Sequence, residues 1–129
     1  MAPTIIHMRD LTVEQIVALH AAIIARDGGD NRIISEPNLH QLVFRANLIA
    51  DPISRTALAL FSLVTYPAFR EGNEKAALEL ATQILAGEGY CIPLKHASEL
   101  ARLAEGILTF TVEPEEIGAW IAAHAKKER

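Results

Sequence analysis

The chain has 129 residues, a length that suits one domain with a single hydrophobic core, and half of its residues are apolar. Aromatic residues make up only 5% of it, so the core must consist mainly of Ile, Leu, Val and Ala. The formal net charge is −4 at pH 7, which offers no attractive field for nucleic acid, and we expect no direct nucleic-acid partner.

Signals that would direct the chain to a membrane are missing from the sequence. No apolar run reaches the roughly 18 residues that a membrane-spanning helix needs. The first ten residues lack the basic-then-apolar pattern of a secretion signal. Cys91 is the single cysteine and cannot form an internal disulfide, which favours a reducing compartment. We therefore expect a cytoplasmic protein with no membrane partner.

Two helices are predicted in the first part of the chain. Thr12 and Gln15 have the spacing of a capping box, and apolar residues then recur every three or four positions. The Gly-Gly pair at 28–29 should end this first helix. A second helix should begin after Ser35, a good N-cap, with Pro37 tolerated in its first turn.

The third and fourth predicted helices flank a proline. Asp51 and Pro52 are a cap and a first-turn proline, and the helix that they open must end before Pro67. The fourth helix should run from 72–73 to a glycine stop at Gly87 and Gly89. It is rich in alanine and has a wide apolar face, so we expect it to be the central, most buried helix.

The last part of the chain completes a bundle. Residues 90–92 are strand-like but too short for more than a small local pairing. A fifth helix is expected over the apolar positions 100–108, and a sixth after Thr111, with Trp120 facing inward. No linker, repeat or change in composition divides the chain. The sequence thus predicts a compact all-α bundle of about six helices around a central helix, spanning 1–129, with at most a tiny strand pair.

The stretch at 67–75, Pro-Ala-Phe-Arg-Glu-Gly-Asn-Glu-Lys, stands where the fourth helix begins. The N–H groups of a first helical turn lack internal partners, and together with the helix dipole they form an anion site. Gly72 would let a phosphate approach closely, and Asn73 can cap the turn or orient the loop. Glu71 is a hard oxygen ligand for magnesium.

Two further residues of this stretch fit the same interpretation. Lys75 adds a mobile positive charge one step into the helix. Phe69 is an isolated aromatic residue that would anchor the loop in the core. The alternative is an ordinary helix start, because acidic residues and Asn are common there.

The nine residues resemble the signature of the Fic/Doc (Fido) family: His, any, Phe, any, Asp or Glu, Gly or Ala, Asn, Gly or Lys, Arg. The likeness extends to 11–29, which is similar to the first helix of the Doc ("death on curing") branch, with its Leu-His pair and Gly-Gly, and to 35–43. Leu78 stands where many Fic enzymes have a second arginine and Doc-like proteins often have Leu. The resemblance implies a Doc-like Fido domain in which the signature loop precedes the central helix.

The resemblance also implies a role for each residue of the stretch. Those that keep the family's residue type are the buried anchor, the magnesium-binding acid and the two residues that shape the anion hole: Phe69, Glu71, Gly72 and Asn73. Lys75 replaces the family's Arg, which keeps the charge but loses the bidentate grip on phosphate oxygens. Glu74 replaces Lys or Gly, and its carboxylate would repel a phosphate if it turned inward.

The gravest departure is Pro67, in the position of the family's general base. That histidine takes the proton from the target hydroxyl, whereas proline has no ionisable group, and losing such a base typically costs about 10²–10⁴ in rate. The five histidines are far from this position in sequence, and we interpret each as a surface or partly buried helix residue, although one can approach the loop in space: His7, His20, His40, His96 and His124.

Two functions follow from the resemblance. The first is a Doc-type toxin that uses a nucleoside triphosphate such as ATP, with Mg²⁺, to transfer a phosphoryl or nucleotidyl group to a protein hydroxyl. The Doc branch acts on elongation factor Tu and is neutralised by a small antitoxin with a disordered tail. The second is a degenerate member, catalytically weak or inactive, that retains anion binding or serves only as a partner-binding module. Three substitutions within nine residues favour weakened activity.

Overall fold

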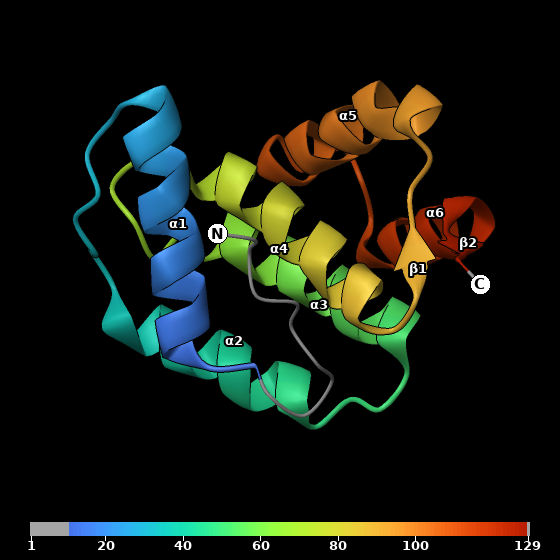
Figure 1. Cartoon of the computed structure of the whole chain (residues 1–129), viewed down its shortest axis with the longest axis horizontal. Helices are drawn as coiled ribbons and strands as arrows, with labels where there is room; N and C mark the ends of the chain where they lie inside the picture. Colours follow the sequence, from blue (N-terminus) through green and yellow to red (C-terminus); the bar gives the residue numbers. More distant parts are fainter. Residues whose placement is uncertain (1–10, 129) are drawn as a thin grey trace.

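The computed structural model describes residues 11–128, which form six α-helices and one short strand pair (Figure 1). The helices are Val13–Asp27 (α1), Glu36–Asn47 (α2), Pro52–Thr65 (α3), Asn73–Gly87 (α4), Ala97–Leu108 (α5) and Pro114–His124 (α6). The strands Tyr90–Cys91 (β1) and Lys126–Lys127 (β2) pair antiparallel, and a 3₁₀ turn at Leu94–His96 precedes α5. The prediction of an all-α bundle with a tiny strand pair is confirmed.

The first three helices begin at the caps that the sequence predicts, and the first ends at the predicted glycine. Thr12 accepts a hydrogen bond from the amide of Gln15 at 3.1 Å, and the Gln15 side chain accepts one from the amide of Thr12 at 2.8 Å. Ser35 and Asp51 cap α2 and α3 in the same way, each accepting from an amide three residues on. Gly28 ends α1 with φ of +86°. Local capping chemistry therefore fixes the helix boundaries.

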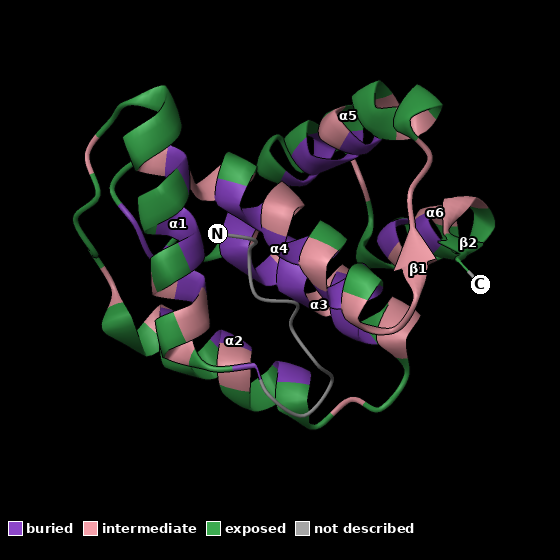
Figure 2. Ribbon diagram, in the orientation of Figure 1, coloured by how far each residue is buried: buried purple, intermediate pink, exposed green. Residues whose placement is uncertain are grey.

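The centre of the bundle is a pair of helices. As predicted, α4 is central and buries an apolar face, but it shares this place with α3. The prediction that α4 is the most buried helix is wrong, because more residues are buried in α3. Buried residues are concentrated where α3 and α4 face each other and where the other helices cover that pair (Figure 2). Two buried polar side chains of α3 have partners, since Arg55 donates to the carbonyl of Ala46 at 2.7 Å and Thr56 to that of Pro52 at 2.7 Å. Within the described residues, the buried Oγ1 atom of Thr65 has none. None of the helices within residues 11–128 combines the length and the apolar character needed to cross a bilayer.

The C-terminal segment returns to the far end of α4. Ile117 and Ile121 of α6 are buried, whereas Trp120, predicted to face inward, is only half-buried. β2 follows α6 directly and pairs with β1, which follows α4 (Figure 1). The start of α4 and the end of α4 thus lie in two different environments, the first beside α1 and the second beside α6 and the strand pair.

Candidate anion-binding site at the start of α4

The loop before α4 is held by the chain that connects α1 to α2. We call residues 67–72 the motif loop. Ile33 faces Phe69 in an isolated antiparallel bridge, and the amide of Arg70 donates to the carbonyl of Arg32 at 2.9 Å. The motif loop is therefore fixed by backbone hydrogen bonds to a segment almost forty residues earlier in the chain.

Asn73 orients the motif loop through three hydrogen bonds. Its Oδ1 atom accepts from the amides of Ala68 at 3.1 Å and Phe69 at 3.0 Å, and its Nδ2 atom donates to the carbonyl of Phe69 at 2.7 Å. Of the two roles predicted for this residue, capping the turn or orienting the loop, the structure shows the second. A single amide side chain thus sets the course of the backbone that leads into α4.

Phe69 anchors the loop in the core, as predicted, and it does so against a histidine. Phe69 and His20 are each 1% exposed, and their rings stack with centroids 3.6 Å apart and planes 5° apart. His20 also donates from Nε2 to the carbonyl oxygen of Glu71 at 2.7 Å. His20 is therefore the support on which the motif loop rests.

The place of His20 was only partly visible in the sequence. It is a helix residue, as interpreted, but the interpretation as a surface or partly buried residue is wrong, because His20 is fully buried. It is also a histidine that approaches the loop in space. The signal that marks it is its position on the apolar stripe of α1, with Ile16 four residues before it and Ile23 three residues after it. Its imidazole is not part of the lining of the cavity described below, so it is not placed to act as a general base there.

Gly72 is required by both the backbone and the packing. Its φ is +79°, a left-handed conformation that side chains other than glycine rarely adopt. A Cβ atom there would lie 3.3 Å from Nε2 of His20 and 3.3 Å from Cδ1 of Ile24. The predicted reason for this glycine was the approach of a phosphate. The structure gives a second reason, since the missing side chain would point at α1.

The first turn of α4 opens into a cavity. No side chain of residues 11–128 caps this helix, and within the same residues the amides of Asn73, Glu74 and Lys75 have no hydrogen-bond partner. The cavity has a volume of about 440 Å³, within the range of small-molecule sites. It is lined by residues 71–75 together with Ile23, Ile24, Gly28 and Leu78. The amides of a helix N-terminus therefore face space large enough for a phosphate group.

The structure gathers most, not all, of the predicted site residues around this cavity. Glu71, Gly72, Asn73, Glu74 and Lys75 line it. Phe69, predicted to contribute to nucleotide binding, lies beneath it in the core. Pro67 also lies outside the lining, and its carbonyl accepts a hydrogen bond from Asn38 at 3.0 Å.

Charges in the cavity do not favour a bare anion. Lys75 forms an ion pair with Asp27, with Nζ 3.2 Å from Oδ2, rather than pointing a free charge at the cavity. Hydrogen bonds from Arg26 and then Lys75 hold the pKa of the Asp27 carboxyl well below its usual range. Glu71 and Glu74 add two carboxylates to the lining, and Oε1 of Glu71 accepts from the amide of Asp30 at 3.3 Å. A phosphate bound here needs a cation beside it.

A second group of titratable side chains lies beyond the other end of α4. His96, Glu99 and His124 come together there from the start of α5 and the end of α6. Both histidines are predicted to be surface or partly buried helix residues, and both are partly buried. The spacing of His96 and Glu99, three positions apart, was a visible signal, but only tertiary packing brings His124 to them.

No known protein family and no characterised protein matches this sequence. The likeness to the Fic/Doc family therefore rests on the signature residues and stays a prediction.

Proposed function

We propose that the cavity at the start of α4 binds the phosphates of a nucleotide such as ATP together with Mg²⁺, and that Pro67 leaves this site without a general base. The observation that supports the proposal is the uncapped first turn of α4, which opens into a cavity of about 440 Å³ with a carboxylate at its edge. Helix N-termini of this kind bind phosphate through backbone amides.

The residues around the cavity fit a magnesium ion as well as a phosphate. Mg²⁺ in nucleotide sites is bound by one or two carboxylates and by phosphate oxygens, with water in the remaining positions. Glu71 supplies such a carboxylate, and its carbonyl is fixed by His20. When bound, the ion would supply positive charge that offsets the carboxylates of Glu71 and Glu74.

The activity that this proposal assigns is weakened group transfer in a Doc-like member of the Fido family. The acceptor would be a protein hydroxyl, such as one on elongation factor Tu. In this proposal, the amides at the start of α4 bind the phosphates, Asn73 orients the loop and Glu71 binds the magnesium ion. No residue takes the proton of the acceptor hydroxyl, since Pro67 cannot ionise and His20 is buried behind the loop.

Calorimetry with ATP tests the binding half of the proposal. We expect heat of binding with Mg²⁺ and a much smaller signal without it. Glu71→Gln should weaken binding because it removes the magnesium ligand, and Glu74→Gln should strengthen it because it removes a repelling carboxylate. Glu115→Gln is the matched control, since it makes the same change of charge at an exposed position of α6. No heat from ATP and Mg²⁺ in the native protein and in Glu74→Gln would refute the proposal.

Transfer from labelled ATP to proteins of a cell lysate tests the catalytic half. We expect Pro67→His to raise the rate of labelling by up to about 10²–10⁴, the usual contribution of a positioned general base. Pro67→Ala is the control, because it removes the proline without adding a base. Labelling by the native protein as fast as by Pro67→His would show that a base is present elsewhere.

A second function, a partner-binding module, is favoured by one surface. Phe44 lies on α2, and Leu48, four positions later, is the C-cap of this helix. Their side chains are 66% and 71% exposed. Such exposure is unusual for two neighbouring large apolar side chains. The partner would be a small antitoxin with a disordered tail, encoded next to this chain. Phe44→Ala with Leu48→Ala should abolish its binding and leave ATP binding intact. Leu94→Ala, an 89% exposed leucine elsewhere, is the control.

A further inference from the structure

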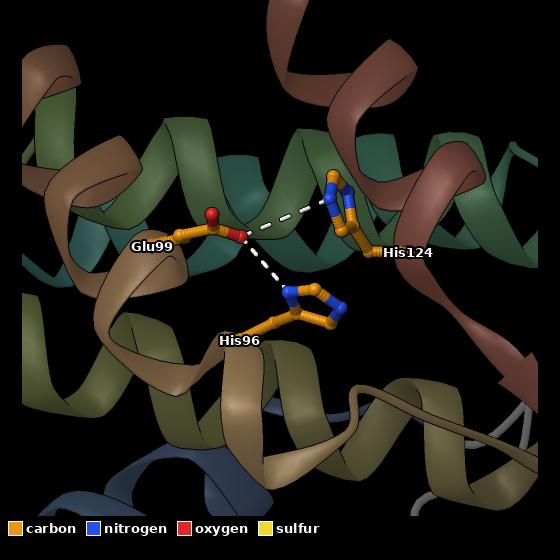
Figure 3. Close-up of side chains that lie close together, drawn as sticks. All are labelled: His96, Glu99 and His124. Atoms are coloured by element: carbon orange, nitrogen blue, oxygen red, sulfur yellow. Dashed lines mark hydrogen bonds and ion pairs between the residues drawn. The ribbon is translucent and has the colours of Figure 1, made fainter.

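Three potential metal ligands meet where α5 begins and α6 ends (Figure 3). We call His96, Glu99 and His124 the His/Glu cluster. Nδ1 of His96 lies 2.9 Å from Oε1 of Glu99, and Nε2 of His124 lies 3.8 Å from the same oxygen. One ligand atom from each residue lies within 4.8 Å of the other two. The two imidazoles therefore converge on one carboxylate oxygen.

The orientation of His124 is set by a bond on the other side of its ring. Nδ1 of His124 lies 2.8 Å from the carbonyl oxygen of Trp120, and since a carbonyl only accepts, Nδ1 is the donor. The His124 ring also stacks on the Trp120 indole, with centroids 4.1 Å apart and planes 19° apart. In metal sites, a ligating histidine usually donates its second ring N–H to a carbonyl or carboxylate in this way. Nε2 is the atom left to face the cluster.

Without a cation, this arrangement has an unsatisfied contact. A neutral His124 that donates from Nδ1 has a lone pair on Nε2, and that lone pair faces the carboxylate oxygen of Glu99. The 3.8 Å separation is too long for a hydrogen bond. Either a second proton on His124 or a metal ion between the groups would turn this contact into an attraction.

We propose that His96, Glu99 and His124 form a binding site for a divalent transition-metal ion of the Zn²⁺ class. Two imidazoles and one carboxylate are a donor set that suits Zn²⁺, with three protein ligands and a remaining position for water or an external ligand. The side chains are 24%, 43% and 25% exposed, in the order His96, Glu99, His124, so an ion can reach them from solvent. Bonds of about 2.0–2.2 Å would require His124 to move closer to the other two ligands, and the hydrogen-bonded atoms of His96 and Glu99 to separate slightly to admit the ion.

The ion would join α5 directly to α6. Both of these helices pack on α3. The His/Glu cluster connects the start of α5 to the end of α6 (Figure 3). The end of α6 leads into β2, which pairs with β1 (Figure 1). Metal binding would therefore fasten the C-terminal helix to the bundle and raise the melting temperature of the protein. This site is separate from the proposed nucleotide site, which lies at the opposite end of α4.

The test uses tag-free, metal-stripped protein and Zn²⁺ alone, without nucleotide, in calorimetry and thermal unfolding. We expect one Zn²⁺ per chain and a rise in melting temperature with Zn²⁺ concentration. His124→Ala, His96→Ala and Glu99→Gln should each weaken Zn²⁺ binding by more than about tenfold, since even second-shell partners contribute about 10- to 100-fold. His40→Ala and Glu105→Gln, at exposed positions outside the cluster, should leave affinity unchanged.

Two outcomes would overturn the proposal. One is the absence of a Zn²⁺-dependent rise in melting temperature in the native protein. The other is an affinity in Glu99→Gln and His96→Ala equal to that of the native protein, which would place the bound ion elsewhere. Co²⁺ gives an independent readout, because its visible absorption reports its ligands, and the spectrum of the native complex should be lost in His124→Ala. Circular dichroism of the metal-free variants separates loss of ligands from loss of fold.

Discussion

The two ends of α4 carry two candidate sites that are built in opposite ways. At the start of α4 the groups offered to a ligand are mostly backbone amides, and buried side chains behind them hold the loop in place. At the far end they are partly exposed side chains from separate elements, and Trp120 supports His124 through its ring and its carbonyl. Substitutions that disturb the first site should therefore also destabilise the core, whereas substitutions in the His/Glu cluster should leave the core largely unchanged.

Replacing the anchor of the motif loop should have the largest effect. Phe69→Ala removes a fully buried ring that stacks on His20, so we expect a loss of about 3–5 kcal/mol in the free energy of unfolding. Urea denaturation measures it. Phe69→Leu should lower the free energy of unfolding by clearly less than Phe69→Ala. His124→Ala in the metal-free protein should lower it by less than Phe69→Leu. A loss for Phe69→Ala no larger than for His124→Ala would remove the contrast between the two ends.

Asn73 should come next, because its side chain serves backbone groups. Asn73→Ala leaves the amides of Ala68 and Phe69 without an acceptor, and we expect a loss of about 1–3 kcal/mol. Asn73→Asp keeps the acceptor and adds a negative charge near a helix N-terminus, which is favourable, although it replaces the donor to the Phe69 carbonyl with a carboxylate oxygen that repels that carbonyl. It should therefore be the milder change. Equal losses for the two variants would mean that the acceptor atom is not what holds the loop.

Gly72 should come third, because both its backbone and its packing require glycine. Its φ of +79° and ψ of 14° are a left-handed conformation, which should cost an alanine about 1–2 kcal/mol. A Cβ atom there would also meet Nε2 of His20 and Cδ1 of Ile24 at 3.3 Å. Gly72→Ala should therefore destabilise the protein by more than the conformation alone costs, and by less in an Ile24→Ala background, as measured by urea unfolding. An equal loss in both backgrounds would mean that crowding against Ile24 does not add to the requirement for glycine.

Features of the two sites that depend on neighbouring residues could be predicted from the sequence, whereas features that depend on tertiary packing could not. The helix starts and the motif residues depend on local chemistry, so Thr12, Ser35 and the stretch at 67–75 could be recognised in the sequence. The support from His20 depends on which face of α1 meets the loop, and the pairing of Lys75 with Asp27 depends on how α1 and α4 pack. The His/Glu cluster depends on the return of α6 to the start of α5. Contacts of this kind, between residues far apart in the sequence, depend on tertiary packing and cannot be predicted from residue spacing.

The smallest expected effect concerns an exposed ion pair beside the motif loop. Hydrogen bonds from Arg32, and its charge with that of Arg70, lower the pKa of Asp30 from 3.8 to about 2. Oδ2 of Asp30 lies 3.4 Å from Nε of Arg70, which belongs to the motif loop. A carboxyl whose pKa is lowered by folding stabilises the protein above its unfolded-state pKa, and this contribution is lost as the pH falls through the folded-state value.

Asp30→Asn should therefore differ from the native protein by a small, constant free energy of unfolding above about pH 4, the ordinary range of an aspartate. The difference should narrow between about pH 4 and pH 2, where the native carboxyl takes up its proton. Because the pair is exposed, added salt should shrink the difference as well. Urea unfolding of both proteins from pH 6 to pH 2 measures it. If the difference in free energy of unfolding stays constant down to pH 2, the charge of Asp30 does not stabilise the protein. Asp30 would then support the motif loop only through hydrogen bonds that its protonated form can also make.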